Sequence, residues 1–174
     1  LWVGTDDGNV QFTTDGGTNW KDVTPALLVA GAPRNYWVTR VVPSRHNAST
    51  VFVTITGFHR DDFKPFVYRT DDGGMTFRAI TGGLPDNAPA NVMVEDPVNA
   101  RLLFLGTDRG LFVSLNGGAQ WLPFKANMPI VPVRDALVHP RENDLIVGTH
   151  GRGLYVTDIL PLRELNEDVL AKDV

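Results

Sequence analysis

The sequence contains no cysteine among its 174 residues, which excludes disulfide bonds and thiolate metal sites. No apolar run approaches the roughly 20 residues that a helix needs to cross a bilayer, and no apolar leader segment follows Leu1. The net charge is −4, and the lysines and arginines are dispersed, so no basic patch of the kind that binds nucleic acid is present. We therefore expect neither a nucleic-acid partner nor a membrane span.

The most distinctive feature is an eight-residue pattern that occurs three times. Residues 13–20 (TTDGGTNW) return as 70–77 (TDDGGMTF) and, with substitutions, as 114–121 (SLNGGAQW). An Asp or Asn side chain can accept hydrogen bonds from the N–H groups of its own turn. The glycine pair permits the positive φ of a tight hairpin, and the aromatic residue offers apolar area to bury. We interpret the following residues as structural: Asp15, Gly17, Trp20, Asp72, Gly74, Phe77, Asn116, Gly118 and Trp121.

The three copies resemble Asp-boxes, also called BNR repeats, of sialidase-type and sortilin-type (Vps10) β-propellers. In that family the motif closes the hairpin between the third and fourth strands of a blade. Residues 148–156 (GTHGRGLYV) resemble the end of the propeller in large bacterial sortilin-like proteins, which are often labelled glycosyl hydrolases. The resemblance covers nearly the whole chain. It implies the C-terminal part of an all-β propeller and a secreted parent protein, extracellular or periplasmic.

Three landmarks share one repeat length. The Asx position of the motif recurs at 15, 72 and 116, a proline that closes an apolar strand recurs at 43, 97 and 140, and a Gly-Thr pair recurs at 4, 106 and 148. The spacings give a period of about 43 residues with one insertion, which is typical of four short strands in a propeller blade. The predicted fold is therefore all-β, with about four antiparallel blades.

Alternating apolar residues locate the strands of these blades. The first blade lacks an inner strand and the last an outer strand, which indicates part of a larger propeller. The predicted strands are 1–5, 9–14 and 19–24; then 37–42, 50–56, 66–70 and 76–80; then 90–95, 101–106, 110–114 and 120–124; and finally 133–138, 144–148 and 153–157. We expect propeller blades at 1–160 and a tail at 161–174, in which apolar residues at helical spacing indicate a short helix.

In an antiparallel meander the Asp-boxes mark one face, and the remaining loops of each blade lie on the opposite face. In sialidase-like relatives the working groove lies on that opposite face. Its loops are rich in charge, and loops on a rigid scaffold commonly carry function. The ligand-binding candidates there are Tyr36, His59, Arg60, Asp61, Asp62, Asp108, Arg109, His150 and Arg152.

The insertion that breaks the period lies at residues 57–65 (GFHRDDFKP). It mixes aromatic residues with charges of both signs, whereas a plain connector is usually rich in Gly, Ser and Asn. We predict that it projects beside residues 34–37 and walls the main groove, with a polar lining of Tyr36, His59, Asp61 and Asp62. Alternatively, Arg60 and the two aspartates pair only with one another or with neighbouring blades.

Two aromatic residues and two arginines carry further expectations. Tyr36 is expected to be exposed, whereas Trp37 starts a strand and is expected to pack between blades. Arg40 and Arg134 hold matching places in two inner strands, where they could bind an anion or form salt bridges with acids of the central channel. Asn116 is expected to tolerate substitution better than the aspartates of the other two boxes, because its box departs most from the pattern.

The sequence does not specify a catalytic site. Asp61 and Asp62 are the only candidates, but neighbouring strand residues point apart, so a glycosidase pair would need Asp6, Asp7 or Asp108 as a partner. A sialidase would need a tyrosine nucleophile and an arginine cluster, and that set does not map onto this chain. No zinc, EF-hand, nucleophile-elbow or phosphate-loop spacing occurs. We expect no cofactor, although the paired aspartates could offer oxygen ligands to a structural calcium ion.

Two functions remain open at this point. The chain is either a sortilin-like module that binds peptides, proteins or other ligands, or part of a sialidase- or xyloglucanase-like glycoside hydrolase with a carbohydrate groove opposite the boxes. The expected partners are accordingly a protein, peptide or glycan ligand, together with the remaining blades of the parent chain. Because the boxes are structural and a fold does not determine function, they do not decide between the two.

Overall fold

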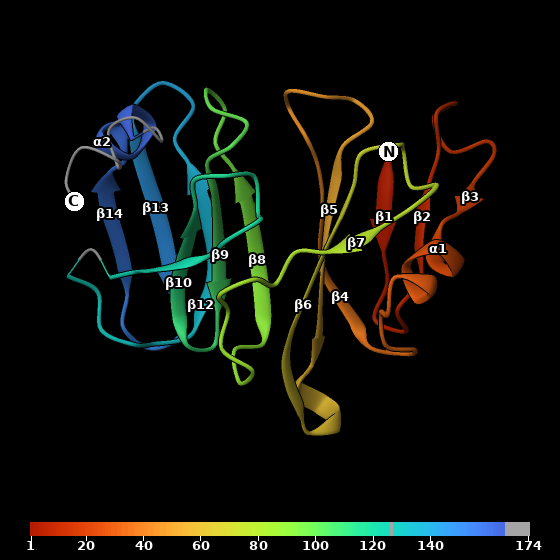
Figure 1. Cartoon of the computed structure of the whole chain (residues 1–174), viewed down its shortest axis with the longest axis horizontal. Coiled ribbons are helices and arrows are strands. Elements are labelled where there is room, and N and C mark those ends of the chain that lie inside the picture. Colours follow the sequence, from red (N-terminus) through yellow and green to blue (C-terminus); the bar gives the residue numbers. More distant parts are fainter. Residues whose placement is uncertain (126, 166–174) are drawn as a thin grey trace.

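The computed structural model describes residues 1–125 and 127–165, which form four antiparallel sheets arranged in chain order across the molecule (Figure 1). Within each sheet, strands that follow one another in sequence are hydrogen-bonded neighbours. The first two sheets are β1 (Trp2–Gly4), β2 (Val10–Phe12) and β3 (Lys21–Asp22), then β4 (Trp37–Pro43), β5 (Val51–Gly57), β6 (Asp62–Thr70) and β7 (Arg78–Ala79). The last two are β8 (Ala90–Glu95), β9 (Leu103–Thr107), β10 (Gly110–Ser114) and β11 (Leu122–Phe124), then β12 (Val133–Val138), β13 (Asp144–Thr149) and β14 (Leu154–Asp158).

The predicted blade architecture is confirmed, since each predicted strand overlaps an observed one. The outermost strands β3, β7 and β11 are shorter than expected, because their first residues belong to the Asp-box turns. Strand β6 begins four residues earlier than predicted. The insertion extends the β5–β6 hairpin as far as a Gly57–Asp62 pair, and a short 3₁₀ turn, η1 (Phe58–Arg60), closes it.

Two short helices complete the described part of the chain. Helix α1 (Thr24–Val29) was not predicted; Pro25 lies in its first turn, where proline favours helix initiation, and Gly31 follows its end with a φ of +90°. Its Leu27 is buried against the first two sheets. Helix α2 (Leu160–Glu164) follows β14, and residues 166–174 of the expected tail lie outside the described residues. The division of the chain at residue 160 remains a prediction.

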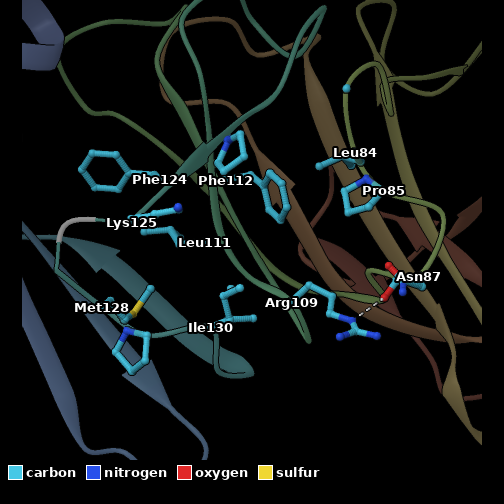
Figure 2. A pocket seen from close by; sticks show the side chains of 14 residues that line it. Leu84, Pro85, Asn87, Arg109, Leu111, Phe112, Phe124, Lys125, Met128 and Ile130 are labelled. Carbon is cyan, nitrogen blue, oxygen red and sulfur yellow. Dashed lines mark hydrogen bonds between the residues drawn. The ribbon is translucent and has the colours of Figure 1, made fainter.

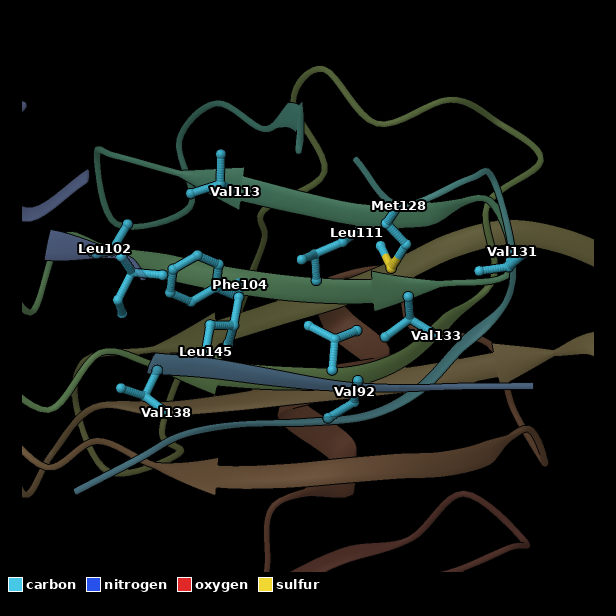
Figure 3. Packing of buried hydrophobic residues seen from close by; sticks show 12 residues of the cluster. Val92, Leu102, Phe104, Leu111, Val113, Met128, Val131, Val133, Val138 and Leu145 are labelled. Atoms are coloured by element: carbon cyan, nitrogen blue, oxygen red, sulfur yellow. The ribbon is translucent and has the colours of Figure 1, made fainter. Parts of the chain in front are cut away.

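The hydrophobic core consists of three clusters, one between each pair of neighbouring sheets. Side chains alternate between the two faces of each strand, so one strand supplies two clusters. In β10, Phe112 packs toward the second sheet, whereas Leu111 and Val113 pack toward the fourth (Figure 3). Each inner sheet is therefore covered on both faces by its neighbours.

The first and last sheets each leave one apolar face uncovered. In β14, Leu154 and Val156 take the places that Leu111 and Val113 hold in β10, but they are 74% and 62% exposed. At the other end, Leu1 and Val3 match two buried leucines of β9 but are 74% and 44% exposed. These faces lie at opposite ends of the molecule in Figure 1.

All three Asp-box turns have the same hydrogen-bond pattern. In the first, the Thr13 hydroxyl donates to Asp15 (2.7 Å) and accepts from the Gly17 N–H (3.0 Å), and Asp15 accepts from the Asn19 N–H (2.9 Å). The second box repeats these bonds at matching positions. The third box also repeats them with Ser114 and Asn116 in place of threonine and aspartate. The substitutions in the third box therefore preserve the turn.

The box turns and the insertion lie on opposite faces of the blades. The Gly73 N–H donates to the Ser49 carbonyl (2.9 Å), which places the second box beside the loop between β4 and β5. The tip of the β5–β6 hairpin, with η1, lies at the opposite edge of the same sheet (Figure 1). The predicted placement of the insertion is therefore confirmed.

Candidate functional site

A groove of about 530 Å³ lies between the first and second blades, on the face opposite the Asp-boxes. Three segments form it: the β1–β2 turn, the crossover that enters β4, and the end of β5 with η1. Its lining residues are Asp6, Asp7, Asn35, Tyr36, Trp37, Thr56, Gly57, His59 and Arg60. The crossover and the insertion therefore meet at this groove, as predicted, although a larger cavity of about 580 Å³ lies beside the third blade (Figure 2).

The β1–β2 turn supplies two carboxylates. Thr5 organises the turn, because its hydroxyl donates to Asp7 and accepts from the Asn9 N–H (3.0 Å). Gly8 has a φ of +92°, and a Cβ at this position would lie 2.8 Å from the Tyr36 carbonyl oxygen. Only glycine allows the turn to approach the crossover so closely.

The charge of Asp7 is fixed by this turn. The hydrogen bond from the Thr5 hydroxyl lowers the pKa of Asp7 below its usual value, despite an opposing effect of burial. Asp7 is therefore ionised at neutral pH. A general acid of a glycosidase needs the opposite shift, so Asp7 is suited to accept hydrogen bonds or bind a cationic group instead.

Tyr36 forms the floor where the crossover meets the insertion. Its hydroxyl donates to Asp62 (3.3 Å), its ring packs edge-on against Phe66 (5.8 Å between centroids), and the Arg60 guanidinium lies 6.0 Å from its ring centre. Burial, followed by the negative charge of Asp62, raises the pKa of the Tyr36 phenol. The phenol is therefore protonated at neutral pH and donates its proton to the hydrogen bond with Asp62.

Trp37 and His59 form an aromatic pair at the groove. Their ring centres are 3.8 Å apart with an interplanar angle of 39°, and Trp37 is 45% exposed. The expectation that Trp37 packs between blades while Tyr36 is exposed is therefore wrong. Successive residues point in opposite directions as the chain enters a strand; Tyr36 takes the inward direction, where Asp62 accepts its hydroxyl, and Trp37 points outward.

Asp61 and Asp62 do not line this groove, contrary to expectation. Asp61 ends η1 in the left-handed conformation (φ 56°), and its N–H donates to the Phe58 carbonyl (3.3 Å). Asp62 accepts from Tyr36 and from the Lys64 N–H (3.2 Å). Asp62 therefore anchors the hairpin through Tyr36, and not through Arg60 or a neighbouring blade as the alternative had it. Asp6 and Asp7 are the carboxylates that face the groove.

The other predicted ligand residues lie elsewhere. Asp108 accepts from Asn91 (2.9 Å) and forms an ion pair with Arg134 (3.1 Å). Arg109 lines a separate cavity beside the third blade. His150 and Arg152 are exposed in the β13–β14 turn and line neither cavity.

The two arginines of the inner strands form salt bridges. Arg40 pairs with Asp135 of the fourth blade, and Arg134 pairs with Asp108 of the third. Each pair links two blades: Arg40 and Asp135 lie on the inner strands β4 and β12, whereas Asp108 lies in the β9–β10 turn. Of the two roles that the sequence left open for these arginines, the structure shows the ion pairs.

Of the nine predicted ligand residues only Tyr36, His59 and Arg60 line the groove, and Asn35 and Thr56 are among the lining residues that were not predicted. Asn35 has a positive φ (58°), a conformation in which asparagine is enriched among residues other than glycine. The Thr56 hydroxyl accepts from the Phe58 N–H (3.3 Å) at the base of η1.

Among the described residues, no group of three or more His, Asp or Glu side chains could hold a metal ion, and no helix is long and apolar enough to cross a membrane.

No protein-family model matches the chain, and no curated protein matches its sequence. Solved structures do share its fold. A GH74 enzyme of Niastella koreensis has a TM-score of 0.66 at 16% identity, over 90% of this chain and 26% of that chain. The GH74 xyloglucanase of Xanthomonas campestris has a TM-score of 0.61 at 16% identity, over 90% of this chain and 25% of that one. The structure of YCF48 bound to D1 peptide has a TM-score of 0.55 at 13% identity, over 90% of this chain and 50% of that chain.

At these identities the likeness concerns the fold alone. The chain is a segment of a β-propeller, and it spans about a quarter of the GH74 chains and half of the YCF48 chain.

Proposed function

We propose that the chain is part of a sortilin-like Asp-box propeller and binds a peptide or another polar ligand in the groove between its first two blades. The observation that carries this proposal is the exposed Trp37–His59 pair beside Asp6, Asp7 and Arg60. A rigid aromatic surface next to charges of both signs offers stacking and hydrogen bonding to one ligand. The YCF48 structure, which has this fold, contains a peptide.

The chemistry of the groove favours binding over turnover. The lowered pKa of Asp7 argues against this residue as the general acid that a glycosidase needs. Asp62 accepts a hydrogen bond from the Tyr36 hydroxyl and does not line the groove. A glycoside hydrolase is the second candidate, supported by the shared fold of the GH74 enzymes and by an indole that a sugar ring could stack on. In that case Asp6 and Asp7 would have to be the reacting carboxylates.

The test measures binding and turnover on the same protein. The chain is screened on a peptide array and a glycan array, and with chromogenic glycosides. We expect binding without turnover, weakened about tenfold or more by Trp37→Ala, with an unchanged melting temperature. Trp20→Ala is the matched control, because Trp20 is equally exposed but lies on an Asp-box. Turnover that is lost in Asp7→Asn would establish the hydrolase. Ligand binding that is unchanged in Trp37→Ala would refute the proposal that the ligand binds in this groove.

We also propose that further blades of the same repeat cover the two apolar end faces. The inner blades show how each face is used, since Leu111 and Val113 are buried by the following blade. Leu154 and Val156 present the same pattern at the end of the chain. At the other end, the Trp20 indole donates to its own turn, whereas the matching Trp121 donates to the preceding blade.

A further inference from the structure

The third Asp-box contains the only Asn–Gly pair of the chain, Asn116–Gly117. An asparagine that precedes glycine can cyclise, because glycine has no side chain to hinder the attack of its amide nitrogen on the asparagine side chain. The other two boxes have Asp–Gly pairs at the matching place, Asp15–Gly16 and Asp72–Gly73. The third box therefore carries an amide where the other two carry a carboxylate.

The two aspartates resist this cyclisation, because an ionised carboxylate is a poor target for a nucleophile. A hydrogen bond from the Asn19 N–H lowers the pKa of Asp15 well below its usual value, and the Thr76 hydroxyl has the same effect on Asp72. Both are therefore ionised at neutral pH. The Asn116 amide has no charge, and its residue is exposed to water. Of the three boxes, the third is thus the one with a reactive side chain.

The folded turn engages both groups that would react. The Gly117 N–H donates to the Arg101 carbonyl (2.8 Å), and the Gly117 carbonyl accepts from Nη1 of Arg69 in the preceding blade (2.9 Å). Oδ1 of Asn116 accepts from a hydroxyl and an N–H of its own turn, at 3.0 and 2.9 Å. The Gly117 nitrogen can therefore reach the Asn116 side chain only when the turn opens.

We propose that Asn116 is a site of spontaneous deamidation, which the closed third box suppresses and which local opening of this box releases. On opening, the Gly117 nitrogen bonds to the side-chain carbonyl carbon of Asn116. The bond from that carbon to the side-chain nitrogen breaks, and ammonia leaves with the proton of the Gly117 amide. Water then opens the cyclic imide and gives aspartate or isoaspartate at position 116. One water is consumed, one ammonia is released, and the box gains one negative charge.

The two products have different effects on the turn. Aspartate is the residue of the other two boxes, so it keeps the acceptor for the Ser114 hydroxyl. Isoaspartate adds a carbon to the main chain and displaces Gly118, whose N–H donates to the same hydroxyl (2.9 Å). Trp121 ends this box, and its indole donates to the Ile80 carbonyl of the second blade (2.7 Å). We therefore expect isoaspartate, and not aspartate, to weaken the contact between the two blades.

The test follows deamidation of the whole chain in its folded and unfolded states. The protein is incubated in mildly alkaline buffer with and without guanidinium chloride, and peptide mapping by mass spectrometry measures conversion at each asparagine. In the unfolded chain Asn116 should convert faster than every other asparagine. In the folded protein its conversion should be slower by about tenfold or more, because the reaction waits for local opening. The fraction that contains isoaspartate should unfold at a lower temperature than Asn116→Asp.

Arg69→Gln tests the role of the preceding blade. It should speed conversion in the folded protein about fivefold or more, because it releases the Gly117 carbonyl, and it should leave the rate in guanidinium chloride unchanged. Arg78→Gln is the matched control, since Arg78 also pairs with Asp71 (2.6 Å), whereas the hydrogen bond to Gly117 comes from Arg69.

Three results would overturn the proposal. They are equal rates in the folded and unfolded states, faster conversion at another asparagine of the unfolded chain, and equal acceleration by the two arginine variants. The comparison of folded with unfolded protein uses the unchanged sequence, so it decides the matter even if Arg69→Gln fails to fold.

Discussion

Trp20 and Trp121 occupy the same position of the Asp-box but have different roles. Trp121 is 1% exposed, and its indole N–H donates to the Ile80 carbonyl of the preceding blade (2.7 Å). Trp20 is 44% exposed, and its indole donates to Gly17 within its own turn (3.0 Å). The aromatic residue therefore joins two blades only where a preceding blade is present.

This difference predicts unequal costs of truncation. Trp121→Ala should lower the free energy of unfolding by about 3–5 kcal/mol, because it leaves a large cavity between two blades. Trp20→Ala should lower it by less than about 1 kcal/mol, as is usual for exposed side chains. Urea unfolding of both variants measures the two values. Equal losses would contradict the assignment of Trp121 to the interface between blades.

Asn116 should be as important to its turn as the aspartates are to theirs. The sequence favoured greater tolerance, but the Asn116 side chain accepts from both the Ser114 hydroxyl and the Gln120 N–H. Asn116→Ala should therefore cost about 1–2 kcal/mol through the unpaired turn amide. Asn116→Asp, which keeps the acceptor, is the control. Thermal unfolding measures both variants. An unchanged stability of Asn116→Ala would instead support the expectation that Asn116 tolerates substitution better than the two aspartates.

Asp72 should make stability depend on pH in the acid range. Hydrogen bonds from the Thr76 hydroxyl and N–H lower the pKa of Asp72 to about 2. A pKa that is lower in the folded than in the unfolded state gives stability that is complete above about pH 4 and is lost as the pH falls toward 2. Asp72→Asn should flatten this part of the profile. Asp86→Asn removes an exposed charge elsewhere as a control, and an unchanged slope in Asp72→Asn would contradict the prediction.

At the scale of elements, the β5–β6 hairpin separates the residues of the insertion by role. Strand β5 is buried along its whole length and holds the hairpin rigidly in the second blade. At its tip, His59 and Arg60 face the groove, whereas Asp61 provides the left-handed residue that ends η1. Residues that are neighbours in this sequence thus have three different roles: His59 and Arg60 line the groove, Asp61 ends η1, and Asp62 anchors the hairpin.

This separation predicts that Asp61→Gly preserves ligand binding. Glycine adopts the positive φ of this position without strain, so stability should stay within about 0.5 kcal/mol or rise slightly. His59→Ala should weaken binding of any ligand found for the groove, because Trp37 loses its stacking partner. Binding isotherms of the two variants decide the matter. A loss of binding in Asp61→Gly at unchanged stability would assign Asp61 a ligand role.

At the scale of the whole molecule, repetition of the blade explains both the closed core and the two open faces. Every face between two described blades is filled by one of three apolar clusters. The same residue positions at the two ends carry Leu1, Val3, Leu154 and Val156, which are exposed. Apolar surface of this pattern favours association with another apolar surface.

The end faces should therefore make this chain self-associate. Sedimentation velocity should show association that increases with concentration, and the double substitution Leu154→Lys with Val156→Lys should reduce it. Val29→Lys is the control, because Val29 is also exposed but lies on helix α1. Association that is insensitive to the changes in β14 would contradict the assignment of this face to a neighbouring blade.

The sequence by itself determined the fold class, the strand order and the turns. These features depend on local chemistry, since strand alternation, glycine at positive φ and Asx hydrogen bonds all act within a few residues. The sequence also placed the insertion beside the crossover at Trp37, because a meander fixes which loops share a face. It did not predict helix α1, whose six residues are too few to show a helical period.

Only the tertiary structure decided which side chains face the groove. Tyr36 and Trp37 are neighbours in sequence, and the partner of Tyr36, Asp62, comes from a strand 26 residues away. The same contact removed Asp62 from the groove and left Asp6 and Asp7 as its carboxylates. Which of several similar residues is paired depends on distances between segments remote in sequence, and local patterns carry no information about those distances.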